Sequence, residues 1–230
     1  MTTPDRPRKS NSRADEPGPD CPLCPRLVAY RLELRERHPD WHNAPVAEFG
    51  PRDARMLVVG LAPGRMGANR TGRPFTGDDA GRLLYATLAE FGFCSGVYDA
   101  RADDGVALVD CRITNVLRCV PPGNKPLPSE LSACRPFLFA TFRRLKRVRL
   151  IVALGRVAHE GVLRAFALKP ADFPFAHGRE HKITANTRKR SIILIDSYHC
   201  SRLNTNTGAL TPQMFSVIFA RARGVLDELR

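Results

Sequence analysis

Cysteines are the residues of this chain with the most specific chemistry, and four of the seven are spaced like metal ligands. Cys21 and Cys24 form a C-x-x-C pair in DCPLCPRL, where two prolines stiffen a turn and direct both thiols to one point. Cys119 and Cys134 follow far along the chain, separated by a proline-rich excursion that can bring them side by side. Four converging thiolates suit a zinc ion or an iron–sulfur cluster, and the spacing alone leaves both open.

Disulfides are the other common use of cysteine. The chain shows no apolar segment typical of a secretion signal, and seven cysteines would leave one without a partner. The pattern therefore favours ligation of a metal over a disulfide framework.

A second candidate site is the glycine-rich segment GLAPGRMGANRTGRPFTGD at 60–78. Its glycines allow backbone N–H groups to converge on an anion or a carbonyl oxygen, although the spacing matches neither the P-loop nor the dinucleotide fingerprint. Phe75 is either a stacking platform for a base or a plug of the core beneath the loop. Asp78 precedes a helical pattern, so it can cap that helix and can also activate water.

Two more polar segments, TNVLRC at 114–119 and SYHCSRLNTNTG at 197–208, each follow a strand-like stretch. Asn115 carries an amide that can read the edge of a pyrimidine or satisfy local backbone. His199 can donate to an oxygen that gains negative charge, or it can simply cap the end of a strand. We expect the other five histidines to be structural.

The elements that must position these residues alternate between buried strands and helices. Apolar or β-rich runs indicate strands at 56–59, 107–119, 148–155 and 191–198, and helical periodicity occurs at 25–38, 79–91, 129–145, 156–168 and 212–229. Continuous apolar strands between helices predict an α/β fold with a mostly parallel sheet covered on both faces. In such sheets the chemistry lies at the carboxyl ends of the strands, which is where the three polar segments fall.

Length and charge set further bounds. The 230 residues, 43% of them apolar, can form a globular core, and we expect 21–230 to be a single domain. Residues 1–20 are polar and proline-rich and are predicted to be a disordered basic arm. A net charge of +13 favours a phosphate-bearing partner. No apolar run approaches the roughly 20 residues of a membrane span.

Together these segments resemble the uracil-DNA glycosylase superfamily and, within it, the iron–sulfur-containing B-type (family 5) enzymes. The resemblance rests on CPLC, the three polar segments and Cys134 in this order, and it runs from about Cys21 to the C-terminal helix. It implies a three-layer α/β/α sandwich around a four-stranded, mostly parallel sheet. It also implies a structural [4Fe–4S] cluster on Cys21, Cys24, Cys119 and Cys134, with Cys94, Cys111 and Cys200 left as ordinary thiols.

The activity implied by the resemblance is that of a monofunctional DNA repair glycosylase. Such an enzyme flips uracil out of DNA and hydrolyses its glycosidic bond, leaving an abasic site, and its substrates can include other deaminated bases such as hypoxanthine. The expected protein is a monomer of the prokaryotic cytoplasm, associated with the nucleoid and not with a membrane. A non-catalytic iron–sulfur DNA-binding protein is the alternative.

The resemblance also assigns roles to single residues. Asp78 and His199 would be catalytic, Arg202 and Leu203 would contact DNA, and the substrate would be bound by Gly60, Ala62, Gly64, Phe75 and Asn115. A-type relatives carry an acid at the position of Ala62, so Asp78 is expected to serve the water here instead. A-type relatives also read His-Pro-Ser where this chain has His199-Cys200-Ser201, which predicts a less rigid loop.

Overall fold

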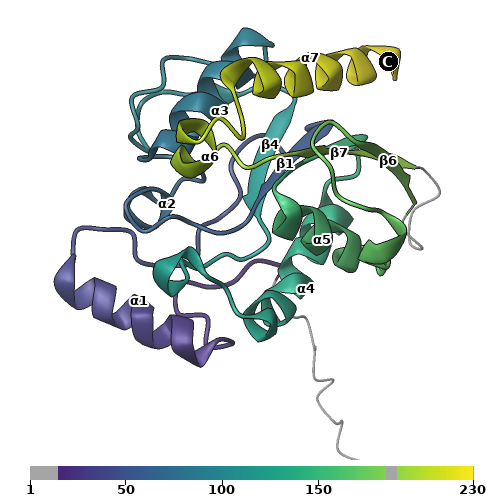
Figure 1. Ribbon diagram of the computed structural model, residues 1–230. Coiled ribbons are helices and arrows are strands. Elements are labelled where there is room, and N and C mark those ends of the chain that lie inside the picture. Colours follow the sequence, from purple (N-terminus) through teal and green to yellow (C-terminus); the bar gives the residue numbers. More distant parts are fainter. Residues whose placement is uncertain (1–14, 185–190, 230) are drawn as a thin grey trace, which may run out of the picture.

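A five-stranded sheet forms the centre of the computed structural model, which describes residues 15–184 and 191–229 (Figure 1). The strand order is β4-β1-β5-β7-β6. The strands are β1 (Met56–Gly60), β4 (Cys111–Asn115), β5 (Leu150–Leu154), β6 (Glu180–Ile183) and β7 (Ile192–Ser197). The pairs β1–β4, β1–β5 and β5–β7 are parallel, and β6 runs antiparallel to β7 at one edge. A separate antiparallel hairpin pairs β2 (Cys94–Ser95) with β3 (Ala107–Leu108).

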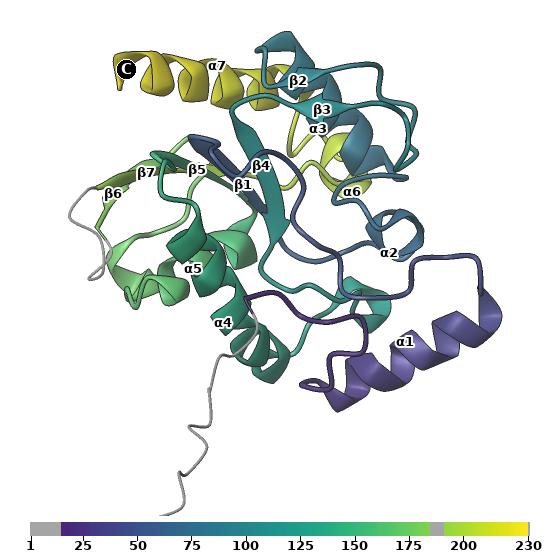
Figure 2. The ribbon, with the colours of Figure 1, turned by 180° about the vertical axis from the view of Figure 1, so that it is seen from behind.

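Helices cover both faces of the sheet, as Figures 1 and 2 show from opposite sides. One face carries α3 (Asp79–Glu90) and α7 (Pro212–Glu228), and the other carries α4 (Pro128–Arg144) and α5 (Arg156–Ala165). Outside these layers lie α1 (Pro25–Arg37), the short helices α2 (Ala68–Thr71) and α6 (Arg202–Asn206), and the 3-10 turns η1 (Pro122–Asn124) and η2 (Pro170–Asp172). Among the described residues, no helix has the length and apolar character needed to cross a membrane.

The two layers of core meet the sheet through alternate residues of each strand. In β1, Met56 and Val58 face the layer of α3 and α7, whereas Leu57 and Val59 face the layer of α4 and α5. All four side chains are fully buried. Burial on both faces is the reason why the strands read as continuous apolar runs, and it confirms the predicted three-layer sandwich.

The predicted strand count was wrong, because the sheet has five strands rather than four. The additional strand β6 has the sequence EHKI, and only Ile183 at its end is buried. An edge strand of this kind needs no apolar run, so periodicity does not reveal it. The predicted stretch 107–119 also divides into β3 and β4, because Asp110 between them adopts a left-handed φ of 53°.

Helix positions agree closely with the periodicity of the sequence. Proline at the first helical position begins α1, α4 and α7, as its fixed φ favours. The helix α5 ends at Ala165, earlier than predicted, and Ala167 just beyond it has a φ of 58°.

The predicted N-terminal arm is described only in part, since 1–14 lie outside the described residues. Residues 15–20 contact the folded chain: Asp15 pairs with Arg143 at 2.7 Å, and Asp20 pairs with Arg35 at 2.7 Å.

Candidate functional site

A cavity of about 620 Å³ lies at the carboxyl ends of the parallel strands. It gathers all the residues predicted to bind substrate, act in catalysis or contact DNA except Gly60. Its lining consists of Leu61, Ala62, Gly64, Ala68, Phe75, Asp78, Asp79, Ala80, Asn115, Asn124, His199, Ser201, Arg202 and Leu203. The three polar segments therefore meet in one place, as expected for strand ends of a parallel sheet.

Gly60 lies beneath this cavity rather than in its wall. It is the last residue of β1 and is the register partner of Asn115, the last residue of β4. A Cβ atom on Gly60 would lie 2.4 Å from Asn115 Oδ1 and 2.5 Å from Phe75 Cζ. Glycine is required here because these two side chains fill the space above it.

Phe75 and His199 form the aromatic part of the wall. Their ring centroids are 5.9 Å apart, with an angle of 27° between the planes. Phe75 is 8% exposed, so it packs on the core and still presents a ring to the cavity. Both interpretations of this residue, plug and platform, are compatible with its position.

Asn115 contributes a buried amide to the cavity wall. The residue is 3% exposed, and its Oδ1 atom has no hydrogen-bond partner. A buried polar atom without a partner costs about 1–3 kcal/mol. An N–H group of a bound molecule can supply the missing bond.

Asp78 caps α3 and also faces the cavity. One carboxylate oxygen, Oδ1, accepts a hydrogen bond from the backbone N–H of Gly81 at 3.1 Å. The other oxygen, Oδ2, lies against Gly64 and Gly67, where an added Cβ would approach it to 2.9 and 2.3 Å. Burial raises the pKa of Asp78 above its ordinary value. A carboxylate with a raised pKa beside a cavity is a good proton acceptor for water.

His199 is held neutral by its surroundings. Burial lowers its pKa to about 4, so the ring carries one N–H donor and one acceptor near neutral pH. The turn that carries His199 lacks proline, and two hydrogen bonds connect its residues. Asn204 Nδ2 donates to the carbonyl of His199 at 2.8 Å, and Ser201 Oγ accepts from the backbone N–H of Asn204 at 3.4 Å.

Arg202 and Leu203 project from α6 at the rim. Leu203 is 72% exposed, an unusual position for a large apolar side chain. Arg202 forms a loose ion pair with Asp79, with 3.7 Å between Nε and Oδ2.

Sequence reasoning missed Asn124, which also lines the cavity. It adopts a left-handed φ of 57° in η1, within the excursion between Cys119 and Cys134. The Pro-Pro-Gly-Asn sequence signals a turn there, but only the fold places that turn beside the strand ends.

The four predicted metal ligands converge at a second, smaller place. Cys21, Cys24, Cys119 and Cys134 line one cavity of about 20 Å³, together with apolar residues that include Leu27, Leu117 and Phe137. All seven cysteines of the chain are free thiols. Burial, with nearby thiols adding to it, raises the pKa of Cys119 to about 12.

The chemistry of this donor set fits a cationic metal or cluster. Arg31 and Arg118 also line this cavity, but two positive charges offset only half of the charge of four thiolates, so ionisation of all four requires a further cation. The backbone N–H of Arg118 also donates to Cys134 Sγ at 3.4 Å, a contact that stabilises a thiolate.

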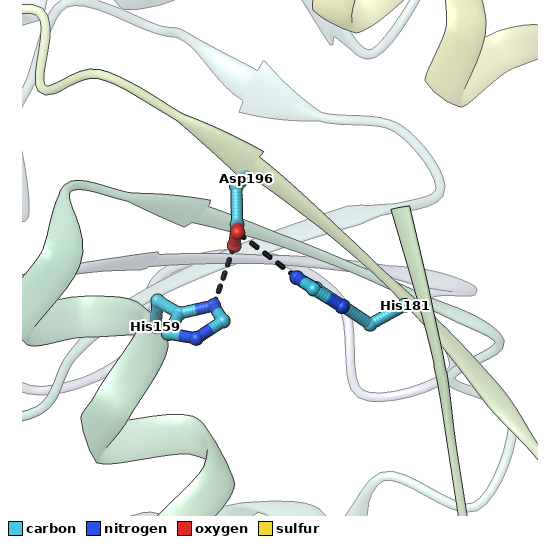
Figure 3. A group of neighbouring side chains, drawn as sticks. All are labelled: His159, His181 and Asp196. Atoms are coloured by element: carbon cyan, nitrogen blue, oxygen red, sulfur yellow. Dashed lines mark hydrogen bonds and ion pairs between the residues drawn. The ribbon is translucent and has the colours of Figure 1, made fainter. Parts of the chain in front are cut away.

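A further group of potential ligands consists of His159 on α5, His181 on β6 and Asp196 on β7 (Figure 3). Their ligand atoms lie within 4.8 Å of one another. His159 Nδ1 lies 2.6 Å from Asp196 Oδ1, His181 Nε2 lies 3.2 Å from Asp196 Oδ2, and His159 Nε2 donates to the carbonyl of Phe173 at 2.8 Å. The 2.6 Å separation is that of a hydrogen bond, so the group ties α5 and β6 to the strand that leads to His199.

Comparison with known proteins places the chain in a family. The family described as the uracil DNA glycosylase superfamily matches residues 47–223. The type-5 uracil-DNA glycosylase of Thermus thermophilus is 44% identical over 209 residues, which cover 88% of this chain and 92% of that protein. The type-5 enzyme of Pyrobaculum aerophilum is 36% identical over 88% of each chain. The type-4 uracil-DNA glycosylase of Archaeoglobus fulgidus is 33% identical over 67% of this chain and 69% of its own length. This chain therefore belongs to the uracil DNA glycosylase superfamily and, within it, to the type-5 family.

Proposed function

We propose that this protein excises uracil from DNA by hydrolysis of the N-glycosidic bond and leaves an abasic site. The observation that carries the proposal is a single cavity that gathers a buried amide, a carboxylate and a neutral imidazole: Asn115, Asp78 and His199. The type-5 relatives are named for this activity.

Binding of the target begins with extrusion of the nucleotide from the duplex, at a cost of a few kcal/mol. The exposed Leu203 side chain would fill the gap left in the base stack, as apolar wedges do. The flipped base would stack on Phe75. Its N3–H would donate to the unpartnered Oδ1 of Asn115.

Hydrolysis then needs a stabilised leaving group and an oriented water. As the glycosidic bond breaks, its electron pair goes to the base, and the sugar becomes oxocarbenium-like. The neutral His199 ring and backbone N–H groups of the 60–64 loop would donate to the uracil anion. Asp78 would hold the water and accept its proton as the oxygen bonds to the sugar. Each such contact is typically worth about 3 kcal/mol.

Lyase chemistry needs an amine nucleophile. The described residues that line the cavity include no lysine. We therefore propose hydrolysis alone.

We also propose that Cys21, Cys24, Cys119 and Cys134 hold a [4Fe–4S] cluster with a structural role. When bound, the cluster would join the segment before α1 to the segment after β4 and to α4. The convergence of four free, buried or half-buried thiols in one cavity supports this assignment. Iron content of about four atoms per chain, with acid-labile sulfide, is the expected composition. Zinc in place of iron would contradict it.

We propose DNA as the partner of a monomeric protein, action at the nucleoid, and a base range that can extend to hypoxanthine. The residues that line the cavity include the small residues Ala62, Gly64 and Ala68, which leave room for a larger base.

A single-turnover assay tests the activity directly. The purified holoprotein is mixed with duplexes that hold uracil, hypoxanthine or thymine at one position, and abasic sites are detected by strand scission in alkali. Scission at uracil is expected, and scission at hypoxanthine would support the wider base range. Tight binding without scission would instead support a non-catalytic DNA-binding protein, for which Ala62 in the position of the A-type acid is the best argument.

A further inference from the structure

The turn that carries Phe75 has an unfavourable backbone conformation. Phe75 has a φ of 52°, in the left-handed region that a bulky side chain rarely adopts. Such a conformation persists only where surrounding contacts hold it. Hydrogen bonds and an ion pair made by the residues on both sides of Phe75 are these contacts.

Arg73 anchors the turn from one side. Its guanidinium forms a two-pronged ion pair with Asp104, with both N–O distances at 2.7 Å, and the Asp104 side chain is 1% exposed. The hydrogen bonds from Arg73 hold the pKa of Asp104 well below its ordinary value. Arg73 Nε also donates to Thr76 Oγ1 at 2.7 Å, so one side chain joins the positions before and after Phe75.

Tyr98 bonds the same turn from the other side. Its hydroxyl donates to the carbonyl of Phe75 at 3.3 Å and accepts from the backbone N–H of Gly77 at 3.2 Å. Its ring stacks on Tyr85, with centroids 4.6 Å apart, and the Tyr85 hydroxyl donates to the carbonyl of Pro74 at 2.9 Å. Every residue from 73 to 77 thus accepts or donates a bond within this network.

Neither Tyr98 nor Asp104 belongs to the cavity wall. Both come from the connection between β2 and β3, which lies beside α3 in Figure 2, outside every segment whose residues suggested chemistry. We propose that Tyr98 and Asp104 are positioning residues, which act through Arg73 and the backbone of the turn to orient the Phe75 ring. The inference rests on the proposed function, in which that ring stacks on the flipped base.

Tyr98→Phe and Asp104→Asn test the proposal in single-turnover cleavage of a uracil duplex. Tyr98→Phe is the milder variant, because it removes one hydroxyl and keeps the stacked ring. It still tests the proposal if the Asp104→Asn protein does not fold. Cleavage should fall by about 10-fold or more, because small misplacements of a positioning group are costly. Affinity for a non-cleavable duplex should change less than the rate. The matched control is Asp103→Asn, which should cleave at the parental rate, because Asp103 is exposed and pairs with the exposed Arg101 at 3.1 Å.

A double-mutant cycle separates positioning from general damage. Phe75→Ala removes the ring but keeps a Cβ in the same backbone conformation. If Tyr98 acts through this ring, Tyr98→Phe should slow the Phe75→Ala protein far less than it slows the parent. Equal fold-losses in both backgrounds would overturn the proposal.

Amide hydrogen exchange gives an answer that does not depend on activity. In Tyr98→Phe, the N–H groups of the turn, above all that of Gly77, should exchange faster while those of β1 stay protected. Unchanged exchange at the turn, or faster exchange throughout, would overturn the positioning role. A parent that fails to cleave uracil DNA would overturn the proposed function alone, because the exchange measurement still decides the role of Tyr98.

Discussion

At the scale of single residues, Asp78 combines two tasks in one carboxylate. One oxygen caps α3, and the other lies at the cavity beside Gly64 and Gly67. Asparagine caps a helix as well as aspartate does, so Asp78→Asn should keep the melting temperature and the affinity for DNA. Cleavage should fall by at least ~100-fold, because the base that orients water is lost. Parental cleavage by this variant would show that another group handles the water.

The pKa of Asp78 also predicts a pH dependence. Burial raises this pKa above its ordinary value, and the reaction needs the ionised form. The cleavage rate should therefore fall as the pH decreases through the raised pKa and level off above it. Burial lowers the pKa of His199 to about 4, so this ring is neutral near neutral pH, where the rate should be level. A pH–rate profile of the parent and of Asp78→Asn is the measurement, and the acid limb should be absent in the variant.

His199 acts on a different partner in the same transition state. His199→Ala should lower cleavage by a factor on the order of 10²–10³, through loss of one donor to the departing anion. Binding of a non-cleavable duplex should persist. His38→Ala is a control, since that ring stacks on Trp41 in a different part of the fold. A silent His199→Ala would leave the backbone N–H groups of the loop as the donors to the anion.

At the scale of elements, Asp196 joins β7 to its neighbours. It is fully buried and accepts from both His159 and His181. Asp196→Ala would leave the buried His159 and the half-buried His181 without their partner and should lower the free energy of unfolding by about 3–5 kcal/mol. Urea denaturation measures the loss, and the exposed Asp172→Ala should change stability by less than about 0.5 kcal/mol. Equal stability of the two variants would contradict this role.

At the scale of the whole molecule, the net charge of +13 predicts an affinity for DNA that depends on salt concentration. Contacts to phosphate release counterions, so affinity falls linearly with salt on logarithmic axes. With six to ten contacts, affinity for a non-cleavable duplex should drop by about 10³–10⁵ between roughly 50 and 200 mM salt. Titrations by fluorescence anisotropy give the slope. A flat response would place the excess charge away from the DNA-binding face.

The cysteine site is also a property of the whole molecule, because two of its ligands come from the start of the described chain and two from its middle. Cys119→Ser or Cys134→Ser should give colourless, poorly soluble protein, since cluster binding and folding are coupled. Cys94→Ser, which changes a buried thiol outside the site, should keep its iron. Full iron content in Cys119→Ser or Cys134→Ser would show that the ligands are assigned wrongly.

Much of the secondary structure of this protein follows from local sequence. Apolar runs such as 56–59 mark strands buried on both faces, prolines begin three of the helices, and Asp78 caps a fourth. These features depend on neighbours in the chain, because dihedral preferences, periodicity and caps involve residues only a few positions apart. The carboxyl-end rule then places Asn115 and His199 in one site without any coordinates.

Other features were decided by the tertiary structure alone. The charged strand β6 exists because β7 offers it a free edge, and Asn124 reaches the cavity because the excursion between two cysteines folds back over it. The left-handed Phe75 is held by Asp104 through Arg73, across 31 positions of sequence. Such contacts join segments that are far apart in the sequence, so no local sequence pattern predicts them. The free energy that selects them comes from burial and pairing, which exist only once the chain has folded.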